Sequence, residues 1–148
     1  MGDERLQGQT FQELTVEECR SLLGQHHLGR IGLVDRDGPL ILPVNYVFYR
    51  LLIVFRTDPG SKLDAAIRGA RVAFEVDATD QASRTGWSVL VRGVATEVTE
   101  TEDLARLQAL PLYPWAPGVR GHYVRITPSS VSGRRIGLPG GLPSTWWG

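Results

Sequence analysis

Two cations and two hydroxyls lie within seven residues of this sequence, and together they could bind an anion. Arg56, Thr57, Ser61 and Lys62 stand where an apolar run ends and a helical pattern begins. Free backbone N–H groups and the positive end of a helix dipole stabilise negative charge at such a junction, and cationic side chains add charge-assisted hydrogen bonds. The pattern predicts a phosphate site. A solvated turn built on Asp58-Pro59-Gly60 is the alternative that these residues leave open.

The elements around this segment are predicted to be antiparallel strands with short connections. Apolar runs at 44–48 and 51–55 are separated only by Tyr49-Arg50, which is typical of a tight hairpin. The segment Asp35-Arg36-Asp37-Gly38 predicts another hairpin just before them. Successive strands without crossover helices argue against a parallel doubly wound sheet and favour a closed or partly open antiparallel barrel.

The periodicity of the whole chain predicts a capped helix, three strands, a helix, two strands, a helix and one or two closing strands. We expect strands at 28–34, 40–48, 51–56, 71–77, 87–98, 123–126 and 131–136, a loop at 78–85, and helices that begin at Thr15, at Ser61 and at Thr99 or Thr101.

Some single residues constrain these elements. Pro43 cannot donate a hydrogen bond to a sheet, so it is expected at an edge or a bulge. A bulge would leave the main chain of the next three residues open to a ligand, and a plain strand edge is the alternative. Gly93 indicates a strand that bends or passes close to another group. Cys19 lies on a helical apolar stripe and is predicted to be a core residue.

The remaining chemistry-bearing residues predict neither a catalytic residue nor a metal site. His26 and His27 are adjacent and lack a metal-ligand spacing, and His122 stands alone at the expected start of a strand. No grouping of Ser, His and Asp indicates nucleophilic catalysis. We therefore interpret the histidines as structural or exposed.

Composition indicates one globular domain. The 148 residues include 42% hydrophobic ones, with 16 basic and 16 acidic side chains, so no overall charge favours nucleic acid. No apolar run is long enough for a membrane span, and the polar N-terminus lacks the pattern of a secretory signal. A single cysteine excludes an internal disulfide, and a cytoplasmic location is expected.

An ordered set of short motifs carries a resemblance to a known family. The motifs are Gly29-Arg30-Ile31-Gly32, Pro43-Val44-Asn45-Tyr46, Phe55-Arg56-Thr57 with Gly60-Ser61-Lys62, Phe74-Glu75-Val76-Asp77, Gly86-Trp87-Ser88-Val89 and Gly133-Arg134-Arg135-Ile136. Over residues 14–136 the chain resembles the pyridoxamine 5′-phosphate oxidase-like family of FMN-binding split β-barrels. The resemblance implies a mainly β fold, namely an antiparallel Greek-key split barrel with short peripheral helices.

The resemblance also implies a homodimer with FMN in clefts at the subunit interface. The segment 43–46 would contact the isoalloxazine ring through its main chain, the cationic segment would hold the phosphate, and Trp87 and Ser88 would contact flavin from the second subunit. The residues assigned to the cofactor are Pro43, Val44, Asn45, Tyr46, Phe55, Arg56, Thr57, Ser61, Lys62, Trp87, Ser88, Trp115 and Arg135.

The function that the resemblance implies is that of a flavin-dependent oxidoreductase acting on an unknown small molecule. A deazaflavin-dependent reductase and a non-catalytic flavin-binding or dimeric interaction module are the alternatives. Oxidation of vitamin B6 is not expected, because the C-terminal substrate-recognising segment finds no match. We expect a loose arm at 1–12, the barrel at 13–136 and a tail at 137–148, in which Trp146 and Trp147 could cover the cleft.

Overall fold

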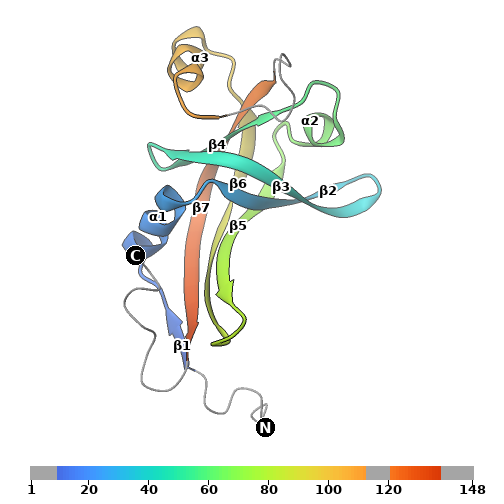
Figure 1. Cartoon of the computed structure of the whole chain (residues 1–148). Helices are drawn as coiled ribbons and strands as arrows, with labels where there is room; N and C mark the ends of the chain where they lie inside the picture. Colours follow the sequence, from blue (N-terminus) through green and yellow to red (C-terminus); the bar gives the residue numbers. More distant parts are fainter. Residues whose placement is uncertain (1–9, 113–120, 138–148) are drawn as a thin grey trace.

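The structure, a computed structural model, describes residues 10–112 and 121–137 and consists mainly of antiparallel strands (Figure 1). The strands are β1 Thr10–Glu13, β2 Leu28–Asp35, β3 Gly38–Tyr49, β4 Leu52–Thr57, β5 Arg71–Asp80, β6 Thr85–Glu97 and β7 His122–Gly137; the helices are α1 Val16–Gln25, α2 Lys62–Ala66 and α3 Thr101–Gln108.

Six of the strands close into a ring. The sheet order is β7-β4-β3-β2-β5-β6, and β6 pairs with β7 to complete the circle, while β1 adds to the outer end of β7. Every pairing is antiparallel. In Figure 1 the long strands β5, β6 and β7 run together down the molecule, and β2, β3 and β4 cross their upper half. The predicted antiparallel split barrel with short helices is confirmed.

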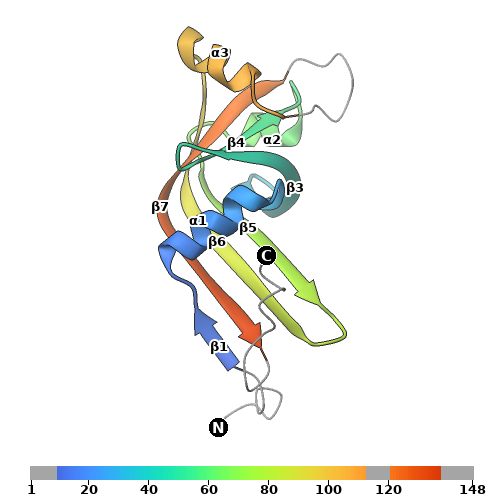
Figure 2. The same cartoon turned by 60° about the vertical axis from the view of Figure 1, so that its left-hand side comes forward.

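The main core fills the ring, because alternate residues of each strand point inward. Phe55, Phe74 and Ile126 are all 0% exposed there. The helices α1 and α2 add apolar side chains to the same core, including Cys19 and Ile67, and Figure 2 shows α1 lying across the ring below β3. The prediction that Cys19 is a core residue is confirmed.

A second, smaller cluster lies on the outer face of β4, under α3. It contains Val54, Val98, Leu107 and Leu112. Because Val54 faces this cluster while its neighbours on either side face the main core, β4 is buried on both faces. This explains why the strand reads as a continuous apolar run.

Local signals account for several boundaries. Thr15 caps α1 in a reciprocal capping box with Glu18, as predicted. The β3–β4 hairpin turns at Arg50 and Leu51, both with positive φ, one residue later than the predicted break. The N-cap of α3 is Glu100, without a side-chain hydrogen bond, so the prediction of Thr99 or Thr101 was wrong.

Three predicted irregular segments are replaced by longer strands. Thr10–Glu13 pairs with the end of β7, so residues 10–12, expected in a loose arm, form a strand. Residues 78–80 and 85 of the predicted loop at 78–85 belong to β5 and β6, whose ladder extends to the pair formed by Asp80 and Thr85, and 81–84 form the turn. The two expected closing strands form the single strand β7, because β6 pairs with it throughout. Long-range pairing outweighs weak local patterns in all three.

None of the helices in the described part of the chain is long and apolar enough to cross a membrane.

Gly93 provides a test of how tightly β6 and β7 pack. A Cβ at this position would lie 2.2 Å from the carbonyl oxygen of Thr127, beside a register shift between Arg92 and Gly93. We expect Gly93→Ala to lower the free energy of unfolding by about 1–3 kcal/mol, since main-chain atoms must move. Urea denaturation followed by circular dichroism measures this change.

The matched control is Gly32→Ala in β2. A Cβ there meets its nearest neighbour at 3.9 Å, an ordinary contact, so the free energy of unfolding should stay the same or rise by about 0.5 kcal/mol. Equal loss in the two variants would contradict the close approach at Gly93.

Candidate functional site

The predicted phosphate segment forms a corner between β4 and α2. The strand ends at Thr57, Gly60 adopts a positive φ of 74°, and Ser61 caps the helix, its Oγ accepting the N–H of Asp64 at 3.0 Å. A hydroxyl that accepts one hydrogen bond still has its own proton to donate. The corner therefore keeps a donor at Ser61.

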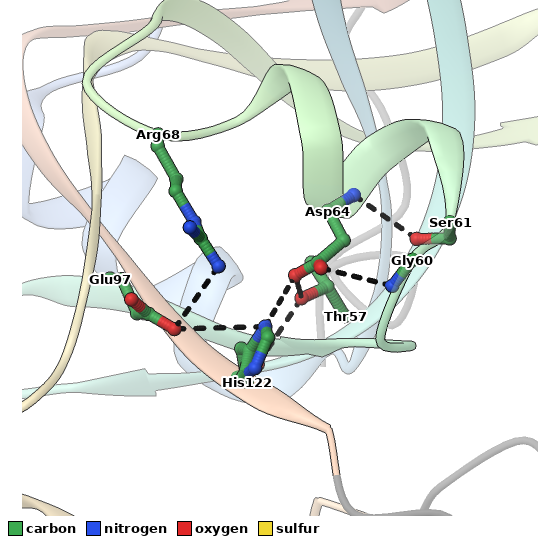
Figure 3. A network of polar contacts seen from close by, with 7 residues as sticks. All are labelled: Thr57, Gly60, Ser61, Asp64, Arg68, Glu97 and His122. Atoms are coloured by element: carbon green, nitrogen blue, oxygen red, sulfur yellow. Dashed lines mark hydrogen bonds and ion pairs between the residues drawn. The ribbon is translucent and has the colours of Figure 1, made fainter.

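The carboxylate of Asp64 holds this corner together (Figure 3). It accepts hydrogen bonds from the Thr57 hydroxyl at 2.8 Å and the Gly60 N–H at 3.1 Å, and it contacts Nδ1 of His122 at 2.6 Å. Burial raises the pKa of Asp64, but hydrogen bonds from His122, Thr57 and Gly60 outweigh burial and hold the pKa below its ordinary value. Asp64 is thus an ionised, buried carboxylate.

The contacts continue from His122 to the neighbouring strand β6 and to the segment after α2. Glu97 lies 3.6 Å from Nδ1 of His122, and Arg68 lies 3.8 Å from the same carboxylate of Glu97. The interpretation of His122 as an isolated residue was wrong, because the pairing of β4 with β7 places it opposite Thr57. Asp64 was missed altogether. The Ser61-x-x-Asp64 spacing, a capping-box form, was the local signal that could have indicated it.

The two cations of the corner lie on its outer side. Lys62 is the only lysine of the sequence and is exposed at the first turn of α2. Arg56 lies between two inward-facing residues of β4, and its guanidinium stacks over the Tyr123 ring at 5.2 Å. The structure thus assigns the two predicted hydroxyls different roles, since that of Thr57 is bound inside by Asp64 and that of Ser61 caps α2.

The strands β3 and β4 part beside this corner. Their ladder ends at the pair formed by Tyr46 and Phe55, so it does not reach Pro43, which pairs only with Arg30 of β2. The expected edge position of Pro43 is confirmed, and the main chain from Pro43 to Asn45 has no β4 partner in the ladder. A ligand could approach that main chain from the side of the corner.

Three of the predicted contact residues in this region have side chains inside the barrel. Val44, Tyr46 and Phe55 are 5%, 1% and 0% exposed. The hydroxyl of Tyr46 donates to the carbonyl oxygen of Leu23 at 2.7 Å, and its ring packs edge-on against Phe74. Only the main chain of these residues could contact a ligand. On the outer face, Asn45 and Val47 line a groove of about 580 Å³ together with His26 and His27.

A second group of predicted residues lies at the other end of β6. Trp87 is 4% exposed, and its ring centre lies 4.9 Å from that of His26. The guanidinium of Arg135 forms an ion pair with the carboxylate of Glu18, with 2.5 Å between Nη2 and Oε2. Glu97 of β6 and Phe55 of β4 both pair with the same residue of β7, so this end of β6 lies near the corner. Trp87 lies ten residues earlier in β6, about 33 Å from Glu97 along the strand. Within one chain, Trp87 is therefore far from the corner, although His26 links it to the groove that Asn45 lines.

Ser88 lines a groove of about 600 Å³ at this second end, together with Glu75 and Arg134. Arg30 contacts both Glu75 at 3.4 Å and Asp77 at 3.0 Å. Burial, with the neighbouring Asp77 carboxyl, raises the pKa of Glu75 to about 7, although Arg30 opposes this. Glu75 therefore loses its proton at a higher pH than an exposed glutamate does.

Other predicted positions cannot be placed. Trp115, Trp146 and Trp147 lie outside the described residues. Among residues 10–112 and 121–137, no cluster of three His, Cys, Asp or Glu side chains could hold a metal ion.

Asp64→Asn tests the carboxylate at the corner. Because its folded pKa lies below the ordinary value of 3.8, the charge stabilises the fold above that pH, and this stabilisation is lost as pH falls through the folded pKa. We expect the variant to lose about 1–3 kcal/mol of unfolding free energy at pH 7. The difference from the unaltered protein should shrink below pH 4, as measured by urea denaturation at each pH.

Asp58→Asn is the matched control, because Asp58 is an exposed carboxylate of the same turn. Its unfolding free energy should change by less than about 0.5 kcal/mol. A pH-independent loss in Asp64→Asn would show that shape, and not charge, is what Asp64 contributes.

Comparison with known proteins places the chain in a family. It is 39% identical to an uncharacterised protein of Mycobacterium tuberculosis over 129 residues, which are 84% of each chain. The solved FAD binding protein from Mycobacterium smegmatis is 38% identical with a TM-score of 0.78, and the match covers 86% of this chain and 99% of that one. A conserved protein of unknown function from Corynebacterium diphtheriae is 33% identical with a TM-score of 0.71, covering 84% and 96%.

The family model that matches is described as pyridoxamine 5′-phosphate oxidase, and it matches residues 15–135, nearly the whole described barrel. These residues include both predicted groups of the site. The chain therefore belongs to the pyridoxamine 5′-phosphate oxidase family, with its split-barrel fold.

Proposed function

We propose that this protein binds a flavin nucleotide at the corner between β4 and α2 and acts as a flavin-dependent oxidoreductase on a small molecule. One observation carries the proposal: the chain leaves the β3–β4 ladder at Phe55, and the residues that bear the donors, Arg56, Ser61 and Lys62, follow directly after that point. A phosphate and a flat ring need such neighbouring features. The similarity to a protein named for FAD binding supports the same conclusion.

The donor chemistry fits a phosphate. A hydroxyl, an ammonium and a guanidinium offer charge-assisted hydrogen bonds to an anion. The buried charge of Asp64 would repel a phosphate, but Thr57, Gly60 and His122 already satisfy it. Bound flavin would supply the electron transfer, and these residues would bind and orient it. No side chain is assigned to catalysis.

The size of the cofactor is part of the proposal. The sequence resemblance implies FMN, and the name of the Mycobacterium smegmatis relative favours FAD. A deazaflavin coenzyme also has a phosphate, and the corner would accept it equally. A non-catalytic flavin-binding module is the remaining alternative, and reduction of bound flavin by NAD(P)H with reoxidation by an acceptor would exclude it.

A homodimer is proposed for two reasons. The corner and the Ser88 groove lie far apart within one chain, and a second copy could bring its Ser88 groove to the first copy's corner. The outer face of β2 and β3 also exposes large apolar side chains, with Val34 71% and Ile41 70% exposed. Such a surface is typical of a protein interface.

Lys62→Ala tests the flavin proposal. The purified protein should be yellow with flavin absorption, and the variant should bind flavin about 10- to 100-fold more weakly, because one charged hydrogen-bonding group is lost. Fluorescence titration of flavin-free protein measures the affinity. Lys62→Arg keeps the positive charge, so this variant should retain most of the affinity for flavin.

Because Lys62 is the only lysine, a second measurement needs no variant. Flavin should protect its amine from an acylating reagent, which mass spectrometry detects as one missing adduct. The proposal would be contradicted by purified protein that is colourless, that binds neither FMN nor FAD, and whose Lys62 is acylated at the same rate with and without flavin.

Ile41→Glu tests the homodimer. An isologous interface carries each substitution twice, so two charges would be buried, and the dissociation constant should rise by at least about 100-fold. Light scattering after size exclusion measures the mass. Leu51→Glu, at the exposed tip of the β3–β4 hairpin, is the control and should leave the mass unchanged. Monomeric unaltered protein would contradict the proposal.

A further inference from the structure

A small pocket lies between α3 and the tip of the β3–β4 hairpin, which lies below α3 in Figure 1. It has a volume of about 150 Å³. Its apolar floor belongs to the second, smaller cluster and comprises Leu52, Val54, Val98 and Leu107. Three arginines, one aspartate and Tyr49 complete the lining, so we call it the arginine pocket. The described residues that line it include none of those that form the corner.

The charges at the arginine pocket are not balanced. Arg50, Arg106 and Arg125 share the lining with one carboxylate, that of Asp103. Oδ1 of Asp103 lies 3.8 Å from Nη1 of Arg106, and Oδ2 lies 3.6 Å from Nη1 of Arg125. Both distances are longer than a hydrogen bond. Within the described part of the chain, neither of these two guanidinium groups has a hydrogen-bonded acceptor, so their donors remain for a second anion.

The positions of these charges are explained only in part by α3 itself. The helix dipole favours Asp103 in the first turn and Arg106 in the last. Arg125 comes from β7, where it pairs across from Val54 of the floor, and the dipole gives no reason for it. Its guanidinium is brought to the pocket by the pairing of β4 with β7.

The turn that carries Arg50 adopts an unfavourable backbone conformation. Arg50 and Leu51 have φ values of 51° and 64°, which Asn and Gly usually supply in two-residue hairpin turns. Backbone outliers of this kind cluster at ligand-binding sites. The guanidinium of Arg50 lies 5.3 Å from the centre of the Tyr49 ring, and both residues line the pocket. The turn thus places a third cation and an aromatic ring beside the apolar floor.

We propose that the arginine pocket binds a small aromatic carboxylate, of the size of benzoate. An apolar cavity of about 150 Å³ holds one benzene ring, so the ring lies on the floor formed by Val54 and its neighbours. The carboxylate lies between Arg106 and Arg125, because the planar donor fork of a guanidinium matches the two oxygens of a carboxylate. The pocket is smaller than the roughly 300–1,000 Å³ of sites for larger ligands, so it does not hold a flavin. The proposal adds a second ligand and does not depend on the proposed flavin function.

The test titrates benzoate into the full-length protein and follows the ligand by NMR. We expect a dissociation constant of about 1 mM or lower. Benzamide has the same ring without the charge, and it should bind at least about tenfold more weakly. Arg106→Gln should weaken benzoate about tenfold, because the charge-assisted hydrogen bonds are lost. The side chain of Arg106 is 51% exposed, so the variant should fold.

Two further variants separate the pocket from a general attraction between anions and arginines. Arg20→Gln is the matched control, because it removes an exposed arginine from α1, and the affinity for benzoate should stay the same. Leu52→Trp keeps all three arginines but fills the floor, so benzoate should bind at least about tenfold more weakly. Circular dichroism checks that each variant is folded.

Three results would overturn the arginine pocket. They are no binding at about 10 mM benzoate, equal affinities for benzoate and benzamide, and an affinity for benzoate that Arg106→Gln does not reduce. The affinity for flavin should be unchanged in Arg106→Gln and Leu52→Trp, since neither residue belongs to the corner. Any of the three results would therefore leave the proposed flavin function standing.

Discussion

The carboxylate of Asp64 joins three segments that are distant in the sequence. It holds the end of β4 through Thr57, the turn before α2 through Gly60, and the start of β7 through His122. A buried carboxylate is costly unless its charge is met by donors, and here every donor comes from a different segment. The shape of the corner therefore depends on one charge, and the cations that could face a ligand lie outside that contact set.

This arrangement separates structure from binding at the corner. The hydroxyl of Thr57 and the N–H of Gly60 are engaged by the protein itself, although both looked available in the sequence. Lys62 is exposed on the first turn of α2, and the guanidinium of Arg56 lies over the ring of Tyr123. A phosphate would consequently meet a preformed surface, because the internal contacts fix the loop before any ligand arrives.

Local patterns predicted most of the barrel and part of the site. Hairpin turns, alternation and the capping box at Thr15 depend on neighbours in sequence, so the strands β2 to β6 and the helix α1 could be placed from the sequence. The pairing of Asp64 with His122 spans 58 positions and could not. Nor could periodicity show that the indole of Trp87 is covered by its own chain, since a buried and a ligand-facing tryptophan have the same local pattern.

Two of the prolines that lie inside strands have a common consequence. Pro43 lies where β3 has β2 as its only ladder neighbour, and Pro128 lies in the part of β7 that pairs with β6 alone. A residue without an N–H keeps a strand extended while offering less to an additional strand. At the openings of the split barrel, the unpaired edges of β3 and β7 thus each contain a residue that cannot donate a hydrogen bond to another strand. The strands can therefore remain separated there, with room for a small molecule, while pairing with the edge of another sheet is disfavoured.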